Sequence, residues 1–329
     1  METAGSIPSF TTKFRQRYLS ALMDNLGILF FVLSLIFLGY KLFTFHDYDS
    51  IETQWRQIPY TQTWWIAGVL TLLPLNWLLE ALKWEMLTAK VQKLSRYDAV
   101  KAVLSGISTG FFTPNRVGEL VGRVAFLDGV NHKSGITLSV VNSLTQNIVM
   151  ALCGVPACIL FFLVSKGKLQ PDTIHFVLIM VLCILVFGIL YFKLPHWSLQ
   201  LKKNRFSDKL KPFTDCLSTY KLKDLLQIIG VSIVRYVVFC FQFYFMLRFF
   251  SIELSPWQAL LTIPTTYLFV TFTPSLAFSE AAVRSSYAVL IIGTFSGPVV
   301  NIALAGVCIW AVNFVLPMLL GSIILVRKK

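Results

Sequence analysis

The sequence predicts an all-α, polytopic membrane protein. Three observations carry this prediction: an excess of apolar residues, their grouping into long runs, and the position of basic residues between the runs. Of the 329 residues, 56% are hydrophobic and 14% are charged, against about 45–50% and 25% in a typical soluble domain. The composition therefore argues against a soluble enzyme, a secreted module or a disordered chain.

Six apolar runs have the length needed to cross a bilayer, for which about 20 residues suffice. They lie at 25–43, 64–82, 136–164, 174–193, 226–248 and 298–326. The first run is too long for the apolar segment of a signal peptide and lacks a small-residue cleavage site, so we expect it to be retained. The sequence thus predicts about six transmembrane helices.

Two further apolar stretches, 99–128 and 257–293, are each broken by a ThrPro dipeptide, at Thr113 and at Thr273. Proline interrupts a helix and biases the preceding residue towards extended backbone. We therefore expect two helical hairpins that return to the side from which they came. Such re-entrant backbone is tolerated only where protein or a water-filled cavity surrounds it.

The distribution of Lys and Arg supports this predicted topology, because cytoplasmic loops retain basic residues. With a cytoplasmic N-terminus, 20 of the 29 Lys and Arg residues lie on the cytoplasmic side and five on the outer side. The sequence therefore predicts a cell (inner) membrane protein with both termini in the cytoplasm. It also predicts that the first hairpin enters from the cytoplasm and the second from outside.

The two hairpins share a motif. Each ThrPro break is followed by a short turn and a Glu-x-x-x-Arg pattern, with Glu119 and Arg123 in the first copy and Glu280 and Arg284 in the second. Residues four apart lie on one face of a helix. Because the hairpins enter from opposite sides, we expect an inverted repeat with a site near mid-membrane. A single integral membrane domain, 1–329, would then comprise a first half, 1–193, and a second half, 194–329.

Five ionisable residues lie deep inside the apolar stretches. Placing each of them in the membrane without a partner costs about 2.5–3.5 kcal/mol of insertion free energy. They are Glu119, Arg123, Arg235, Glu280 and Arg284. Either each Glu–Arg pair only locks its own hairpin, or the charges line a polar cavity and exchange partners with a ligand. Three Arg against two Glu suit an anion such as a lipid phosphate. Arg116, expected at the turn or rim, completes the candidate substrate-binding set.

Other polar and small residues have structural interpretations. Asn142 and Gln146 are expected to make interhelical hydrogen bonds, and Glu80 is interpreted as an anchor at the inner membrane edge. Small residues at intervals of four predict a tightly packed hairpin around its proline break. The expected hairpin-forming residues are Gly106, Gly110, Pro114, Gly118, Gly122 and, in the second hairpin, Pro274.

Other function classes find little support. A net charge of +13 would indicate nucleic acid only if it formed a patch on a soluble face. The six cysteines form no CxxC pair, and the four histidines are scattered without an HExxH motif, a nucleophile elbow or a P-loop. We expect no nucleic-acid partner, no metal, no cofactor and no catalytic residues.

The segments PNRVGELVGRVAFL (114–127) and TPSLAFSEAAVRSSYAVLIIG (273–293) resemble the lysylphosphatidylglycerol synthase transmembrane family. This flippase-like family includes the membrane half of the multiple-peptide-resistance factor, which moves aminoacylated phospholipid between leaflets. The resemblance implies a lipid translocase and assigns Pro114, Gly118, Glu119 and Arg123, then Pro274, Glu280 and Arg284, to the family segments. It also implies that this chain, without a soluble synthase domain, does not make the lipid itself.

The first hypothesis is therefore a lipid flippase whose Arg/Glu-lined cavity admits an anionic or phosphate-containing headgroup. Its partners would be membrane lipids and a separate lipid-synthesising enzyme. A second hypothesis is a membrane enzyme or accessory subunit in glycolipid or lipid-carrier modification, with Glu119 or Glu280 as general base. A third is a small-solute or proton-coupled transporter.

Overall fold

The computed structural model describes residue 36 and residues 58–113, 116–166, 171–203, 215–275, 279–295 and 297–327. Every regular element in these ranges is a helix, which confirms the all-α prediction. The first predicted span, 25–43, lies outside the described residues except for residue 36.

Five helical stretches of the described chain are long and apolar enough to cross a membrane. Each overlaps one of the remaining predicted spans, and the chain is therefore a polytopic membrane protein. They are α3 (Thr63–Thr88), α6 (His132–Lys166), α7 (Pro171–Lys203), α9 (Leu222–Phe249) and a composite last helix. The last consists of α12 (Val299–Trp310), a π-helical turn η5 (Ala311–Val315) and α13 (Leu316–Arg327).

Both stretches with a ThrPro break form pairs of shorter helices. The first pair is α4 (Arg96–Phe111) with α5 (Glu119–Val124), and the second is α10 (Pro256–Phe272) with α11 (Glu280–Ile292). α5 has six residues and is about 9 Å long, too short to cross a bilayer core of about 30 Å. The depth of the two pairs in a bilayer stays a prediction.

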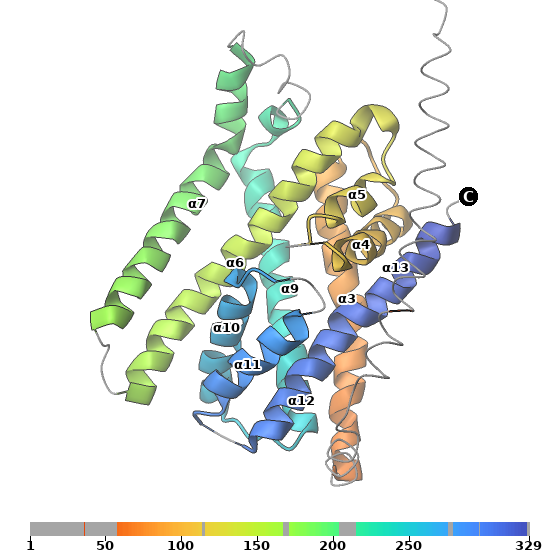
Figure 1. Cartoon of the computed structure of the whole chain (residues 1–329). Helices are drawn as coiled ribbons and strands as arrows, with labels where there is room; N and C mark the ends of the chain where they lie inside the picture. Colours follow the sequence, from red (N-terminus) through yellow and green to blue (C-terminus); the bar gives the residue numbers. More distant parts are fainter. Residues whose placement is uncertain are drawn as a thin grey trace, which may run out of the picture.

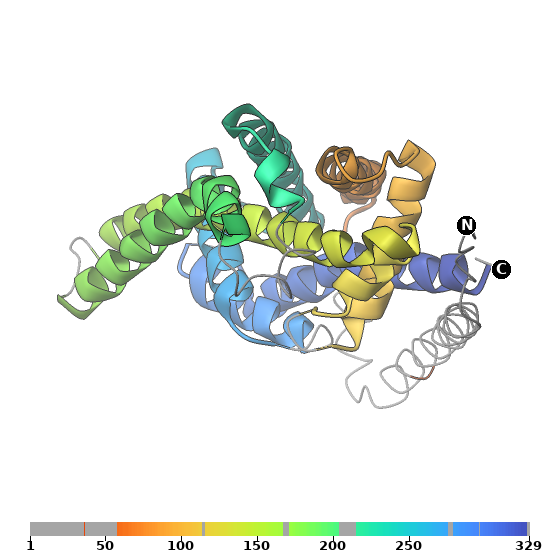
Figure 2. The ribbon, with the colours of Figure 1, turned by 90° about the horizontal axis from the view of Figure 1, so that it is seen from above.

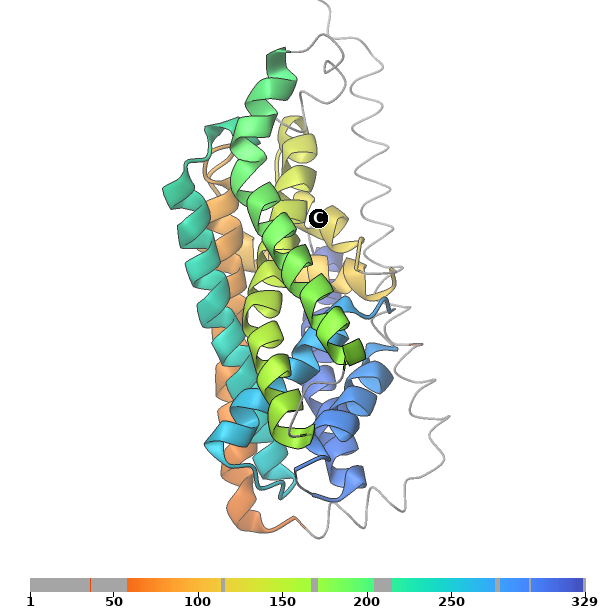
Figure 3. The same cartoon turned by 90° about the vertical axis from the view of Figure 1, so that its left-hand side faces the viewer.

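The two halves pack on each other reciprocally. α3 lies against α9, while α4 contacts α13 and α10 contacts α6. The first helix of each broken pair thus packs on the long helix that follows the other pair. In Figure 1 the α4–α5 pair lies towards the upper end of the molecule and the α10–α11 pair towards the lower end, and the side view in Figure 3 agrees. This arrangement is compatible with an inverted repeat, which stays a prediction.

Glycines set the closest helix approaches. A Cβ on Gly122 would lie 2.4 Å from the Ser105 carbonyl oxygen, and one on Gly118 would lie 2.2 Å from that of Thr109. Backbones of α4 and α5 are therefore in direct contact. Gly106 and Gly110 instead leave room for charged side chains. A Cβ on Gly106 would lie 2.8 Å from Arg123 Cγ, and one on Gly110 would lie 2.5 Å from Glu119 Cγ.

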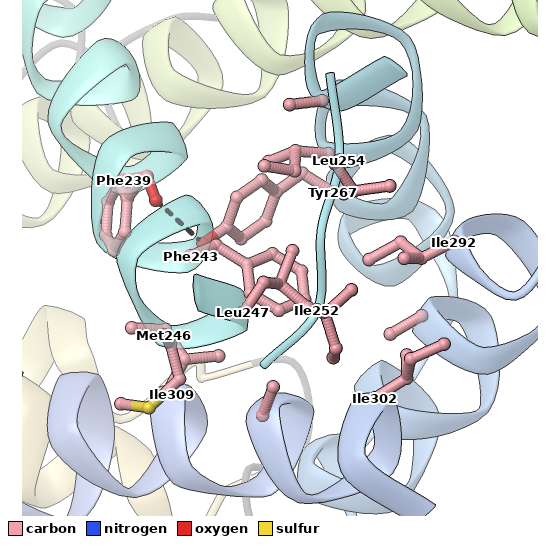
Figure 4. Packing of buried hydrophobic residues seen from close by; sticks show 14 of the residues in the cluster. Phe239, Phe243, Met246, Leu247, Ile252, Leu254, Tyr267, Ile292, Ile302 and Ile309 are labelled. Atoms are coloured by element: carbon pink, nitrogen blue, oxygen red, sulfur yellow. Dashed lines mark hydrogen bonds between the residues drawn. The ribbon is translucent and has the colours of Figure 1, made fainter. Parts of the chain in front are cut away.

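An apolar core holds the second half together. Phe243, Met246 and Leu247 of α9 are fully buried against side chains of α10, α11 and α12, including Tyr267 (Figure 4). The Tyr267 hydroxyl donates a 3.2 Å hydrogen bond to the Phe239 carbonyl. α7 packs mainly on α6 at the edge of the bundle (Figure 2), so the reciprocal packing of the two broken pairs does not involve it.

Candidate functional site

A polar cavity of about 460 Å³ lies where the two broken pairs meet, and its size is typical of small-molecule sites. Its walls come from both broken pairs and their breaks, together with α3, α6, α9 and η5. All six charged residues proposed as a substrate-binding set line it: Arg116, Glu119, Arg123, Arg235, Glu280 and Arg284. Their role in binding substrate stays a prediction.

The charges around the first break, together with Arg235 of α9, converge on the carboxylate of Glu80 on α3. Arg123 Nη2 lies 3.0 Å from Glu119 Oε2 and 2.7 Å from Glu80 Oε1. Glu80 Oε2 lies 2.9 Å from Lys83 Nζ and 2.9 Å from Arg235 Nη1. The i, i+4 pair is therefore present, but its arginine also reaches a second acid on another helix. Glu80 alone is shared by three cations.

The interpretation of Glu80 as an anchor at the membrane edge is wrong. Its side chain is 3% exposed, and it lines the cavity together with Lys83. The expected span stopped at 82, whereas α3 continues to Thr88, so Glu80 lies more than two turns from the end of the helix. An ionised carboxylate at such a place needs cations around it.

The second-half charges form a smaller group that touches the first. Arg284 Nη2 lies 2.5 Å from Glu280 Oε1, and Arg116 donates to the other oxygen of the same carboxylate. Arg116 Nη1 is also 4.0 Å from Glu119 Oε1. The ion pairs thus form a continuous chain from Glu80 on α3 to Arg284 on α11.

Arg116 holds a backbone conformation that is unusual for its residue type. Its φ is 57°, in the left-handed region that costs a non-glycine residue roughly 1–2 kcal/mol. Its guanidinium lies 3.8 Å from the centre of the Phe314 ring as well as against Glu280. These contacts compensate the strained turn and hold the side chain across the gap between the two breaks.

The threonines of the two ThrPro breaks have parallel roles. Thr113 accepts a 2.8 Å hydrogen bond from the Gly118 amide and donates to the Gly110 carbonyl. Thr273 donates to the Phe269 carbonyl and lies 2.9 Å from the Tyr287 hydroxyl on α11. Each threonine ends the first helix and ties it to the second arm. Pro274 lines the cavity, whereas Pro114 lies outside the described residues.

The cavity has a surplus of positive charge. Among the described residues, five cationic side chains and three carboxylates line it, which leaves a net charge of +2. Arg123 and Arg284 are each 3% exposed, and in both the Nε and Nη1 donors have no hydrogen-bond partner among the described residues. Buried guanidinium donors without partners are suited to carboxylate or phosphate oxygens.

Carboxamides surround the same space. Asn142 donates to Glu80 at 2.8 Å, and the Gln146 oxygen accepts from Arg235 at 3.2 Å and from Lys83 at 3.4 Å. The prediction that these two amides bond between helices is therefore confirmed. Asn76 accepts from Arg235 at 2.8 Å and donates to Asn313 at 3.4 Å. Asn313 lies in the π-helical turn, a feature often found at functional sites.

The chain matches one known protein family over most of its length. The family described as the lysylphosphatidylglycerol synthase TM region matches residues 26–321. The chain belongs to this family. Comparisons with curated proteins and with solved structures find no match. Membership in the lysylphosphatidylglycerol synthase transmembrane family fits a lipid-related role in the membrane.

Sequence reasoning missed several cavity residues, four of which take part in its network of ion pairs and amide hydrogen bonds. Glu80 was assigned to the membrane edge, and Asn76, Lys83 and Asn313 received no role, although all four line the cavity. The available signal was an i, i+4 pair of polar residues, Asn76 and Glu80, on one face of α3. Within the described residues, no cluster of His, Cys, Asp or Glu is arranged to hold a metal ion.

Proposed function

We propose that the chain moves a lipid with an anionic, phosphate-containing headgroup between the leaflets of the cell membrane. The observation that carries this proposal is the cavity shared by both halves, with five cations, three carboxylates and unpartnered guanidinium donors in its wall. Its volume of about 460 Å³ accommodates a headgroup, while the acyl chains would remain in the bilayer. Both termini are proposed to lie in the cytoplasm.

The proposed mechanism depends on the carboxylate of Glu280, which two arginines share where the two breaks meet. Glu280 binds Arg116 from one half and Arg284 from its own half. A phosphate that enters the cavity competes with Glu280 for these two guanidinium groups, because it offers the same type of acceptor. Loss of the Arg116 contact would release the break of the first helix pair from that of the second, while the Glu80–Arg235 ion pair still joins α3 to α9. The two helix pairs could then move relative to each other and expose the cavity to the opposite side.

Leaflet exchange in proteoliposomes tests the proposal. Arg284→Gln should slow the exchange of a fluorescent phosphatidylglycerol by roughly 10–100-fold, since a hydrogen bond to a charged group contributes about 1.5–3 kcal/mol. Arg248→Gln is the matched control, because Arg248 lies over Trp65 and does not line the cavity. Undiminished exchange by Arg284→Gln would overturn the assignment of the site.

The same preparation separates the competing hypotheses. Product formed from a labelled sugar or phosphate donor, without leaflet exchange, would indicate an enzyme. Uptake of a small solute without lipid movement would indicate a solute transporter. Either result would refute the proposed lipid translocation.

A further inference from the structure

The Glu–Arg motif builds the same local structure in both halves of the chain. Arg123 uses its Nη2 on Glu119, 3.0 Å away, and Arg284 uses its Nη2 on Glu280, 2.5 Å away. In both arginines the remaining guanidinium nitrogens, Nε and Nη1, are buried donors with no partner among the described residues. Each half therefore places one guanidinium group with unused donors in the cavity wall.

The charge of the cavity is divided equally between the two halves. The first half contributes Lys83, Arg116 and Arg123 against two glutamates. The second half contributes Arg235 and Arg284 against one glutamate. Among the described residues, each half thus has a surplus of one positive charge, which is the charge that one phosphodiester anion neutralises.

The two guanidinium groups have different surroundings. The guanidinium carbon of Arg123 lies 5.7 Å from the centre of the Trp84 ring on α3, and its side chain lies against Gly106 of α4. The guanidinium carbon of Arg284 lies 5.4 Å from the centre of the Tyr267 ring on α10. A ligand bound at Arg123 and a ligand bound at Arg284 would therefore contact different helices.

Two carboxylates separate the guanidinium groups along the chain of ion pairs. Arg123 binds Glu119 and Arg284 binds Glu280, while Arg116 lies between the two glutamates. A phosphate placed midway would face both carboxylates, and like charges placed together cost binding energy. The geometry therefore favours one position at each end of the ion-pair chain over a single position between them.

We infer that the cavity holds two phosphate subsites, one at Arg123 and one at Arg284, and that each binds the phosphodiester of one lipid. The inference rests on the proposed function for the identity of the ligand. Phosphate is common to all glycerophospholipids, so the two subsites do not depend on what else the headgroup carries, an amine included. In translocation the phosphate passes from one subsite to the other.

Isothermal titration calorimetry tests this inference, with the full chain in dodecyl maltoside and dihexanoylphosphatidylglycerol as the probe. Titration into protein-free micelles corrects for partitioning of the probe. The unsubstituted chain should bind two molecules of the probe. Arg123→Gln and Arg284→Gln should each bind one, with an affinity within about threefold of the original, as expected for independent sites. The double variant should bind none.

The opposite result has a distinct signature. If one phosphate bound both arginines, the unsubstituted chain would bind one molecule, and each single variant would bind it on the order of tenfold or more weakly. That result would overturn the inference, as would single variants that still bind two molecules. Arg248→Gln is the matched control, because Arg248 lies outside the cavity lining, and it should bind two. If a cavity variant does not fold, the stoichiometry of the unsubstituted chain still decides.

Failure of the inference differs from failure of the proposed function. Two subsites in a chain without leaflet exchange in proteoliposomes would refute translocation and leave the inference standing. Leaflet exchange by a chain that binds a single molecule of the probe would support translocation and refute the inference.

Discussion

Arg116, in the turn before α5, donates a hydrogen bond to Glu280 at the start of α11 and so joins the breaks of the two helix pairs. The residues are 164 positions apart in the chain, and no other ion pair within the described residues joins the two broken pairs directly. The side chain of Arg116 is 31% exposed and that of Glu280 is 9% exposed. Because Glu280 is more deeply buried than Arg116, removing the charge of Glu280 should cost more stability than removing that of Arg116.

This difference predicts unequal costs of substitution. Glu280→Gln should lower the free energy of unfolding by about 3–5 kcal/mol, because it leaves the buried Arg284 without its carboxylate. Arg116→Gln should cost about 1 kcal/mol or less, since Glu280 keeps Arg284 and Arg116 is partly solvated. Denaturant unfolding of the purified variants in one detergent measures both. Equal losses for the two variants would contradict the prediction that Glu280 is stabilised mainly through Arg284.

A second comparison concerns two glutamates of α3. Glu80→Gln should cost about 3–5 kcal/mol, because Lys83, Arg123 and Arg235 then face one another without the acid that they share. Glu85→Gln is the control: its side chain is 32% exposed and lies 3.4 Å from Arg96, so the loss should be below about 1 kcal/mol. A Glu80 variant as stable as the Glu85 variant would argue against the buried cluster.

The glycine contacts predict opposite effects of adding one methyl group. Gly321→Ala would place a Cβ 2.0 Å from the Leu104 carbonyl oxygen and force α13 away from α4, at a cost of about 1–3 kcal/mol. Gly230→Ala meets no atom within 4 Å and should be neutral or stabilising by up to about 1 kcal/mol, since alanine favours helix. Thermal unfolding midpoints of both variants check the prediction, which fails if their shifts have the same sign.

Thiol labelling tests whether each helix pair returns to the side of entry. Single cysteines at Lys93 and Gly129, which flank the first pair, should react with an impermeant maleimide from one face. Cysteines at Glu253 and Thr294, which flank the second pair, should react from the opposite face. If either flanking pair is divided between the two faces, that helix pair crosses the membrane and the inverted repeat is refuted.

The unsubstituted chain is the control for labelling of the native cysteines. The labelling rate of its Cys216 should depend on pH. Burial raises the pKa of the Cys216 thiol to about 11, and only the thiolate reacts. At pH 7 the thiol is protonated and its labelling should be slow, and the rate should rise as the pH approaches 11. Rapid labelling of Cys216 at pH 7 would contradict its burial.

The helical spans and the motif positions could be predicted because they depend on local patterns. Apolar runs of bilayer length predict α3, α6, α7, α9 and α12–α13, and the two ThrPro dipeptides predict where α4 and α10 end. The Glu–Arg pairs follow from the helical repeat alone, since residues four apart share a face whatever surrounds them. The count of three Arg against two Glu falls short of the net charge of the cavity by the charge of Arg116, because Glu80 and Lys83, which it also leaves out, cancel each other.

The sequence by itself determined that this is a helical membrane protein with two broken segments, each carrying an acid and an arginine on one helical face. Only the tertiary structure decided that Glu80 lies between Arg123 and Arg235 and that Arg116 crosses to Glu280. The physical reason is range: the helical repeat relates neighbours within a turn or two. Contacts between residues 43 or more positions apart depend on how glycine-lined helices pack against one another.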